Sequence, residues 1–584
     1  MKKLGMKIVS VLLAMSLIIA GASATVSAYA ADVSKTLTHI GVSLVDGIVT
    51  TLISGINLIV PDSKDFVQVK DRVNEHFYTG TETFVDEAAD EAAWKLGHSK
   101  ASLVPSDWET KNYYLGGFMA IENGMNNKVE ELLDDMQVRV IAVEDGSGRG
   151  VSVFANIDAI GVSNGDIKKI RAKLEEMNLN VKINSINVSS THCHSCIDTQ
   201  GLWTNLFPKL LKNLGLAYLP FLDKEPGVDT EYMEFLYEKT ATAMKEAIAD
   251  MTVGKMTYAV KDIGDQYFNN KNRKSASALI SEMSRFIFTP ADENIKPTMI
   301  VNVAAHPDVA GLAVDEVDNG RGISGDYVYY LGDEIESAGY NFMFFNGAIA
   351  GIYEDRGPSG DGISVERRYM QSERYGRELG KIALNLTNTK EEIEANLTDL
   401  EKATIAAEKE KGGENYTLWY EDWTSVTERE LEPKLNLLIS EVKIQVTNPL
   451  IQLVGKLNLV NYTVCKEGLK YYIFAEIGYM EMGDVKVVFM PGEIVQDLVA
   501  GGTSLTAEGS YSGKDFGYKS IYELFGDDTV CFGLMNDAIG YVVPDNDYSM
   551  AIVDDHYQEL ISLGKYAASA IMQGFADIAA KVNK

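Results

Sequence analysis

The sequence predicts an α/β fold, in which a mixed β-sheet core is flanked by helices and presents functional side chains at the ends of strands. The main observation is a change in the hydrophobic pattern near Val138, where short apolar runs begin to alternate with stretches of helical periodicity. Such alternation is typical of sheets that are covered by helices. In addition, the 50 glycines and 13 prolines favour many turns between regular elements over a proline-rich linker.

The elements can be assigned in chain order. The runs Val138–Val143 and Val151–Val153 flank Asp145-Gly146-Ser147-Gly148, which predicts a hairpin turn. The segment Thr389–Lys411 is rich in Glu, Lys and Ala and predicts a solvated helix. We expect further strands at Val181–Ser190, Thr298–Ala305, Asn341–Phe345, Tyr471–Phe474, Val485–Met490 and Thr529–Leu534, and further helices at Asn164–Met177, Glu231–Asp250 and Asp555–Lys581.

The N-terminal residues have the three parts of a secretory signal. Three lysines lie among the first seven residues, an apolar run follows at Ile8–Ala20, and Ala28-Tyr29-Ala30 fits a cleavage site. An uncleaved membrane anchor is the alternative, but it needs about 20 apolar residues. We therefore expect residues 1–30 to be a signal peptide, and the mature chain to be secreted or held at the cell surface.

A second N-terminal segment, residues 31–61, has the pattern of an amphipathic helix. Apolar residues recur at steps of three and four from Leu37 to Ile59, and Pro61 ends the pattern. This extension is expected to pack on the main domain or to lie against lipid. Residues 62–584 are then expected to form the functional domain.

Composition excludes several classes of protein. The 53 basic and 84 acidic side chains give a formal net charge of −31, which repels nucleic acid and disfavours an anionic membrane surface. Apolar residues at 46% and charged residues at 23% exclude a disordered chain. Four cysteines are too few for a disulfide framework, so Cys193 and Cys196 are expected to be buried thiols or one structural bridge.

Three of the seven histidines directly follow predicted strands. His192 and His194 are two residues apart, a spacing that points both imidazoles to one face of an extended chain. His306 ends an apolar strand just before Pro307. Zinc prefers imidazole nitrogen, and catalytic zinc sites keep one position open for water. Spacing alone leaves two interpretations open: a zinc site, or histidines that are satisfied by hydrogen bonds at strand ends.

Five short elements resemble, in the same order, the signatures of the neutral, non-lysosomal ceramidases. The run Asn187–Ser195 is similar to N-V-x-x-S-x-T-H-T-H-S, with a shortened spacing before Thr191. The other elements are Asn272-Arg273-Lys274-Ser275, Ala304-Ala305-His306-Pro307, Pro491-Gly492-Glu493 and Asn536-Asp537-Ala538-Ile539-Gly540-Tyr541, with a further tyrosine at Tyr548. Five elements in order are far more specific than any one of them.

The resemblance implies a Zn²⁺ site whose ligands are His192, His306, Glu493 and Tyr541. It also implies that His194 and Arg273 lie beside the metal and that Tyr548 lies near the substrate. A phenol, with an ordinary pKa of about 10, binds well only if the metal lowers that value. The simpler alternatives are a buried tyrosine at the rim of the site for Tyr541 and an acid at a helix start for Glu493.

The sequence also departs from the ceramidase pattern. The element that carries a proposed serine nucleophile in that family aligns with Phe345–Tyr353, which contains no serine, and no G-x-S-x-G elbow occurs elsewhere. Cys196-Ile197-Asp198-Thr199 stands where the family has a glycine-proline-rich turn. Only 43 residues follow Tyr541, so no C-terminal immunoglobulin-like domain is expected.

These patterns predict an exported zinc-dependent hydrolase of amide bonds, in which metal-activated water attacks without a serine. His194 is the candidate general acid and base, and Arg273 would hold the developing oxyanion. The apolar stretch Leu202–Leu222 fits the acyl chain of an N-acyl lipid such as ceramide, or equally the core of a packed helix, and transient membrane contact is compatible with it. The alternatives are a non-catalytic exported binding protein on the same fold and a metallohydrolase of another amide or ester.

Overall fold

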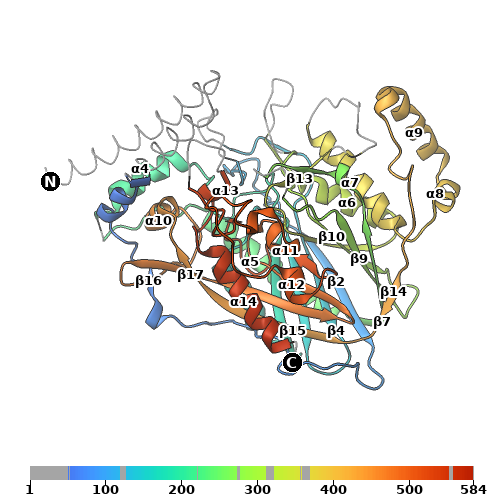
Figure 1. Cartoon of the computed structure of the whole chain (residues 1–584), viewed down its shortest axis with the longest axis horizontal. Coiled ribbons are helices and arrows are strands. Elements are labelled where there is room, and N and C mark those ends of the chain that lie inside the picture. Colours follow the sequence, from blue (N-terminus) through green and yellow to red (C-terminus); the bar gives the residue numbers. More distant parts are fainter. Residues whose placement is uncertain are drawn as a thin grey trace.

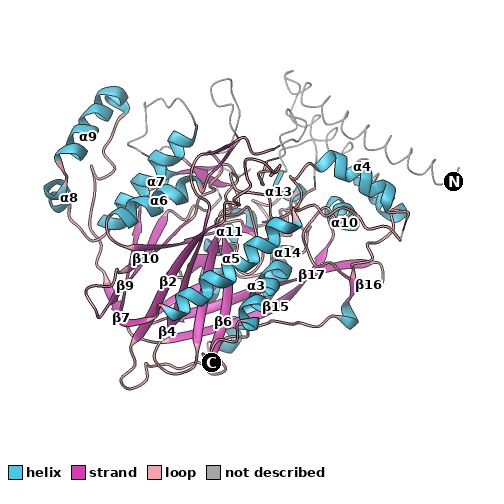
Figure 2. Ribbon diagram, turned by 180° about the vertical axis from the view of Figure 1, so that it is seen from behind, coloured by secondary structure: helices cyan, strands magenta, loops and turns pink. Residues whose placement is uncertain are grey.

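In the computed structural model, two mixed β-sheets pack face to face and helices cover both outer faces (Figure 1, Figure 2). The structure describes residues 50–51, 53–118, 127–219, 221–272, 277–310, 321–355, 357, 368–550 and 557–582. The order of layers is helix, sheet, sheet, helix, which confirms the predicted mixed α/β fold.

The larger sheet contains both parallel and antiparallel pairs. Its strands are β2 (Trp94–Ser102), β4 (Gln137–Glu144), β5 (Val151–Ile157), β6 (Ile183–Ser190), β7 (Thr252–Asp262), β9 (Glu282–Pro290), β10 (Thr298–Val303), β12 (Asn341–Asn346) and β14 (Arg429–Leu431). They run in the order β12-β10-β9-β7-β2-β4-β5-β6, and β14 pairs with β7. The pairs β5–β6 and β10–β12 are parallel. Each parallel pair is joined by a crossover helix, as parallel strands require: α3 (Asn164–Glu176) and α6 (Asp326–Ser337).

The smaller sheet lies against one face of the larger sheet. Its strands are β1 (Val67–Gln68), β15 (Leu435–Val446), β16 (Cys465–Glu467), β17 (Lys470–Met482), β18 (Val485–Phe489) and β20 (Val530–Phe532). They run in the order β1-β16-β17-β18-β20, and β15 pairs with β17. The pair β18–β20 is parallel, so both sheets have strands that end on the same side as the site described below.

Alternate residues of each strand fill two separate cores. In β4, Ile141 and Val143 belong to the core between the two sheets, together with Phe489 of β18. Val138 and Val140 point the opposite way and pack on α5 (Thr230–Ala249) with α3. The apolar run predicted at Val138–Val143 is therefore nearly continuous because both of its faces are buried.

Helices close the two outer faces. Besides α3 and α5, the larger sheet is covered by α6 and α7 (Arg368–Asn385), and the smaller sheet by α11 (Asp497–Ala500), α12 (Ile521–Phe525) and α14 (Ala567–Val582). The segment expected to be one solvated helix forms two, α8 (Lys390–Asn396) and α9 (Asp399–Gly412), which project at one side (Figure 1). The prediction of one helix is wrong because Thr398 and Glu401 form a capping box that starts a new helix.

The remaining predictions from hydrophobic pattern agree with the structure to within a few residues for strands β4, β5, β6, β10, β12, β18 and β20 and helices α3 and α5. The strand predicted at Tyr471–Phe474 covers only the first part of β17, which continues to Met482. The expected closing helix is divided into α13 (Tyr557–Leu560) and α14. No immunoglobulin-like sandwich occurs among the described residues after Tyr541. The long strands β2, β7, β9 and β15 were not expected from the sequence, because polar side chains interrupt their apolar patterns.

The N-terminal extension is described only at its end. Residues 53–59 are helical, and Ile56 and Val60 pack against α4 (Leu206–Leu216) and α10 (Pro449–Lys456). The predicted signal peptide and the start of the amphipathic segment lie outside the described residues. Among the helices that the structure describes, none combines the length and apolar character needed to cross a bilayer.

A buried ion pair joins the layers. The Arg171 guanidinium of α3 donates to both carboxylate oxygens of Glu476 in β17 at 2.9 and 2.8 Å, and both side chains are fully buried. Arg171 also donates to the Ile186 carbonyl at 3.0 Å, so the same side chain holds β6. One guanidinium therefore links the end of the larger sheet to the smaller one.

Replacing Glu476 with Ala is expected to lower the free energy of unfolding by about 3–5 kcal/mol, because it leaves the Arg171 charge buried without a partner. Urea denaturation of the purified variant measures this change. The matched control is Lys255→Ala, which breaks the exposed pair with Glu430 and should have little effect. Equal losses in the two variants would contradict the role assigned to Arg171.

Candidate metal centre at the strand ends

Strands from both sheets end around one small volume. Beyond β6 the chain turns through His192, which adopts a left-handed conformation with φ of +66°. Three residues beyond β10 lies His306. From the smaller sheet, β18 leads through a turn to β19 (Glu493–Ile494), and β19 pairs in parallel with β21 (Tyr541–Val542), which sets Glu493 opposite Tyr541.

The turn that delivers Glu493 requires a glycine. Gly492 has φ of +76°, and a Cβ at this position would lie 2.5 Å from the Gly540 carbonyl oxygen. Only glycine allows this close approach. The Pro491-Gly492-Glu493 sequence is thus explained by backbone geometry, and the strand-end location expected for Glu493 is correct, although it begins a short strand instead of a helix.

Two histidines present the same ring nitrogen to one carboxylate. Nδ1 of His192 lies 2.7 Å from the Ile160 carbonyl oxygen, and Nδ1 of His306 lies 2.8 Å from that of Ile352. Each Nδ1 must therefore carry the proton and donate it, which leaves the lone pair on Nε2. Those Nε2 atoms lie 3.3 and 3.0 Å from the same oxygen, Oε2 of Glu493.

This arrangement places three electron pairs against one another. In their neutral forms, His192 and His306 would offer only acceptors on the side that faces Glu493, and an ionised carboxylate has no proton to give. Burial raises the pKa of Glu493, but positive charge on the neighbouring imidazoles outweighs burial and lowers this pKa well below its usual range. The buried carboxylate is therefore ionised when positive charge lies beside it, and a bound cation could supply that charge.

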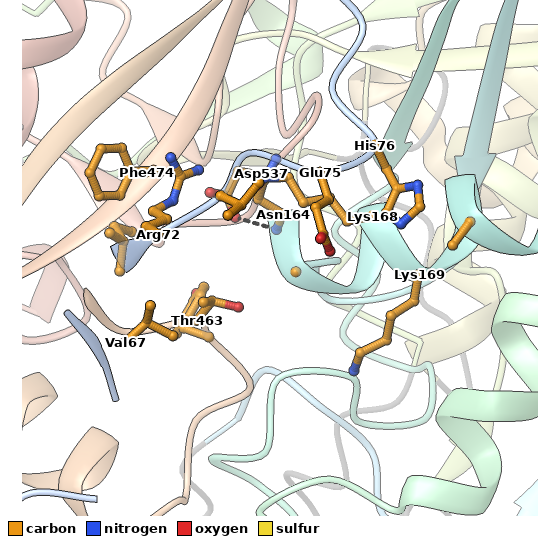
Figure 3. A pocket seen from close by; sticks show the side chains of 15 residues that line it. Val67, Arg72, Glu75, His76, Asn164, Lys168, Lys169, Thr463, Phe474 and Asp537 are labelled. Atoms are coloured by element: carbon orange, nitrogen blue, oxygen red, sulfur yellow. Dashed lines mark hydrogen bonds between the residues drawn. The ribbon is translucent and has the colours of Figure 1, made fainter. Parts of the chain in front are cut away.

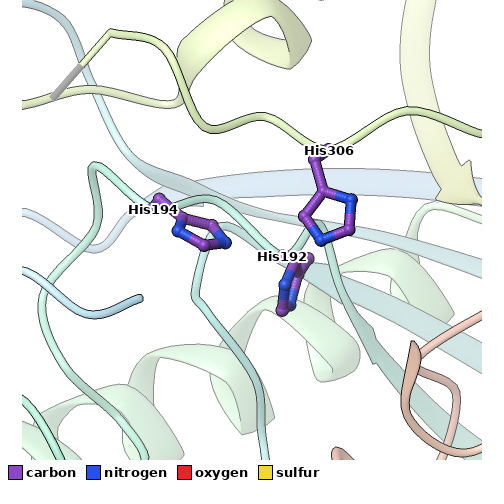
Figure 4. Close-up of side chains that lie close together, drawn as sticks. All are labelled: His192, His194 and His306. Atoms are coloured by element: carbon purple, nitrogen blue, oxygen red, sulfur yellow. The ribbon is translucent and has the colours of Figure 1, made fainter. Parts of the chain in front are cut away.

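A third histidine completes the group. The nearest ligand atoms of His192, His194 and His306 all lie within 4.8 Å of one another, and all three side chains are buried (Figure 4). Within the part of the chain that the structure describes, neither ring nitrogen of His194 has a hydrogen-bond partner. Burial first, and then the nearby histidines, lowers the pKa of His194 well below 6.5, so its imidazole is neutral and can accept a proton or a metal ion.

Two residues hold the His194 ring in place. The Phe118 ring lies 4.6 Å from it, centroid to centroid. Gly117 has φ of +98°, and a Cβ there would lie 2.3 Å from Nδ1 of His194. The backbone at Gly117 therefore touches the imidazole directly. Gly117 was not predicted from the sequence, since a lone glycine in a loop carries no signal of such a contact.

Tyrosines surround the histidines on one side. Tyr541 lies close to His306, with parallel rings whose centroids are 6.4 Å apart, and it hydrogen-bonds to Tyr353. The Tyr353 ring stacks on His306 at 4.5 Å, and the Lys271 ammonium lies 4.2 Å from the same ring. Burial and the Glu493 charge raise the pKa of Tyr541 well above 10. Tyr353 was not predicted as a site residue, because its segment is mainly apolar and contains no motif that marks a functional side chain.

Of the seven residues predicted for the site, the structure brings together five: His192, His194, His306, Glu493 and Tyr541. Tyr548 packs beside Tyr541, but it does not line the cavity next to the histidines. Tyr557 lines that cavity instead, with its ring 5.9 Å from the Tyr541 ring. Arg273 lies outside the described residues.

The two cysteines beside the histidines are not metal ligands in this arrangement. Sγ of both Cys193 and Cys196 points to the Ser324 carbonyl oxygen, at 3.1 and 3.3 Å. Burial raises the pKa of Cys193 to about 11 and that of Cys196 well above its usual value. Both are therefore protonated thiols, in agreement with one of the two states expected from the sequence.

The cavity at the histidines is narrow and partly apolar. Its volume is about 30 Å³, enough for a small number of water molecules. His192, His194 and Glu493 form its polar end, and Leu202 and Trp203 line its apolar wall.

A second, larger cavity of about 420 Å³ lies beyond Tyr462, and Tyr462 borders both cavities (Figure 3). Charged residues such as Arg72 and Lys168 line the larger cavity, and none of the candidate ligands does.

Fold and site together define a class: an α/β protein with a buried group of three histidines and a carboxylate that could hold a metal ion. Two solved structures are similar to it. A neutral ceramidase from Pseudomonas aeruginosa has a TM-score of 0.54 at 13% identity, over 84% of this chain and 75% of that chain. A structure described as ceramidase complexed with C2 has the same TM-score and identity, with 84% and 76% covered.

The sequence matches no protein-family model, and it matches no curated protein. At 13% identity, the structural similarity shows a shared fold. The resemblance to ceramidases that short motifs indicated is thus supported at the level of the fold.

Replacing Gly117 with Ala is expected to displace the His194 imidazole, because the added Cβ would overlap Nδ1. We expect the affinity of the candidate centre for a divalent metal ion, measured by competition with a chromogenic chelator, to fall by about 10-fold or more, as for loss of a supporting contact. Gly148→Ala is the control, since Gly148 also has a positive φ but nothing lies within 4 Å of its added Cβ. Unchanged affinity in Gly117→Ala would show that His194 does not contribute to the centre.

His194 is expected to be neutral at pH 6.5, where an ordinary imidazole is half protonated, in the metal-free protein. The sign follows from its pKa, which burial lowers well below 6.5, because a base is mostly uncharged at a pH above its pKa. Imidazole ¹⁵N chemical shifts should therefore show the neutral form at pH 6.5, with His194→Asn used to assign the signal. A midpoint at or above pH 6.5 would contradict the effect of burial.

Proposed function

We propose that this protein is a zinc-dependent hydrolase that cleaves the amide bond of N-acyl lipids such as ceramide. The observation that carries the proposal is the pair of Nε2 atoms, on His192 and His306, that face one buried oxygen of Glu493. Two neutral imidazoles and one carboxylate have no set of hydrogen bonds among themselves that satisfies all three groups. A divalent cation would accept an electron pair from each of them.

The donor set fits zinc. Two imidazole nitrogens and a carboxylate oxygen are common zinc ligands. Nε2 of His306 and of His192 lie 3.0 and 3.3 Å from the Glu493 carboxylate, so the three groups are close enough to hold one ion together. We assign Tyr541 as a further donor, because β19–β21 pairing sets it beside Glu493, and the ion would need to accept a water molecule in addition to these four side chains.

The ion, when bound, would lower the pKa of a water molecule and polarise the substrate carbonyl. The chain supplies the remaining functions. His194, whose two nitrogens have no partner, would accept the proton of the water and return it to the leaving amine. Arg273 would hold the developing negative charge, as the sequence motif predicts. Tyr548 is proposed to act farther out on the substrate side.

The substrate class follows from the apolar wall. Leu202 and Trp203 lie directly beyond the histidines and are joined by Ile451 and Val460, so a group that enters the site along this wall meets hydrocarbon. This environment suits an acyl chain better than a peptide. The solved structures of similar fold are named as ceramidases, which favours an N-acyl sphingoid base.

The experiment compares metal content and hydrolysis in three proteins. Wild type should bind one zinc per chain and hydrolyse N-acyl lipids, with long acyl chains preferred. His306→Ala should lose the zinc and all measurable hydrolysis, because it removes a ligand and leaves Glu493 without its partner. The control His76→Gln, a half-exposed histidine paired with Glu175, should retain both.

Three outcomes would overturn the proposal in different ways. Stoichiometric zinc and full activity in His306→Ala would refute the assigned centre. A folded wild type without zinc would favour the alternative of an exported binding protein that lacks turnover. Zinc-dependent cleavage of other amides or esters, without activity on N-acyl lipids, would retain the centre and reject the substrate.

A further inference from the structure

A group of apolar side chains is exposed on two neighbouring segments at one end of the molecule. The two most exposed are Leu58 and Phe221, at 86% and 77% of their surface. We define the apolar patch by five residues that share this exposure: Leu58, Ile59, Leu211, Phe221 and Leu222. Water-exposed apolar groups that gather in this way commonly mark a surface for binding.

The two segments that carry the patch are in contact. The hydroxyl of Tyr218 donates to the Ile59 carbonyl at 3.4 Å, and Lys64 forms an ion pair with Asp223. On the inner side, Ile56 and Val60 pack on α4 in one cluster. Helix 53–59 and α4 therefore bury one face each against the protein and leave apolar side chains exposed on the other face.

The charge around the patch differs from that of the whole chain. Residues 53–66, 206–225 and 449–466, which build this end, contain six lysines and four carboxylates, whereas the chain carries −31 overall. Lys64 and Lys212 are more than half accessible and pair with Asp223 and Glu225, whereas two of the other lysines are buried. The edge of the patch is therefore close to neutral and made of paired charges of both signs, so it is compatible with the zwitterionic headgroups of phosphatidylcholine.

The patch also lies directly outside the candidate metal centre. Leu202, Trp203 and Val460 belong to the apolar cluster beneath α4 and helix 53–59, and the same three side chains line the cavity that holds His192 and His194. The side chains beneath the patch thus also form the apolar wall of the cavity. A lipid docked at this point would be separated from the cavity by packed apolar side chains.

We propose that the apolar patch docks this protein on the surface of a phospholipid bilayer. Docking places the apolar wall of the cavity next to the hydrocarbon layer, from which a lipid substrate can enter. The benefit for substrate entry rests on the proposed function, whereas the docking itself does not. Metal-free protein should dock as well as metal-loaded protein, since the patch contains no candidate ligand.

The test measures binding of the full chain to phosphatidylcholine vesicles by co-sedimentation. Wild type should sediment with the vesicles, and Leu211→Glu and Phe221→Glu should weaken binding by about 10-fold or more, because each puts a charge into the apolar contact. Leu469→Glu is the matched control, since Leu469 is 89% exposed but lies at the β16–β17 turn, and it should bind as wild type does. Unchanged zinc content verifies that each variant is folded.

Several results would overturn the proposal. Wild type that stays in solution, or equal weakening by Leu469→Glu, would show that the patch is not a lipid surface. A dimer in solution that Leu211→Glu dissociates, without vesicle binding, would identify the patch as a contact between two copies. Docking that depends on bound zinc would reject the patch as its cause. Vesicle binding without hydrolysis of any lipid would uphold docking while rejecting the proposed function.

Discussion

The structure depends on one electrostatic constraint, the approach of two imidazole lone pairs to a single buried carboxylate oxygen. His192 and His306 cannot relieve it by changing tautomer, because each Nδ1 is already committed to a main-chain carbonyl. Glu493 cannot relieve it by moving into solvent, because it is almost fully buried. The surrounding fold has to hold these groups close together, and a cation bound at the proposed centre would remove their repulsion.

Two features of the fold provide that restraint. The ligands stand at the ends of rigid strands and not on long loops, so their positions are set by sheet pairing. The sheets are in turn tied to each other by the core between them and by the Arg171–Glu476 pair. A site assembled in this way needs little reorganisation on binding a metal, which is the usual requirement for catalysis.

Much of this arrangement is predictable from the sequence, for physical reasons. Strands buried on both faces, such as β4 and β10, give apolar runs that are hard to mistake. The histidines and Glu493 follow such runs, so their position at strand ends is predictable too. Strands with one buried and one exposed face, such as β7, are not predictable in this way, because the polar residues in their sequences are equally typical of loops. Tyr353, Gly117 and Tyr557 reach the site through tertiary contacts alone, and no local pattern reveals them.

The origin of the proposed ligands in both sheets has a consequence for biogenesis. His192 and Glu493 are separated by some three hundred positions of chain, and they meet only once the larger and smaller sheets have packed. A chain that is still emerging or still unfolded therefore offers no complete chelate, and under the proposed function metallation would be a late step that follows assembly of both sheets. A bound ion would then stabilise the packing of the two sheets, so that separating the sheets and releasing the metal would be coupled.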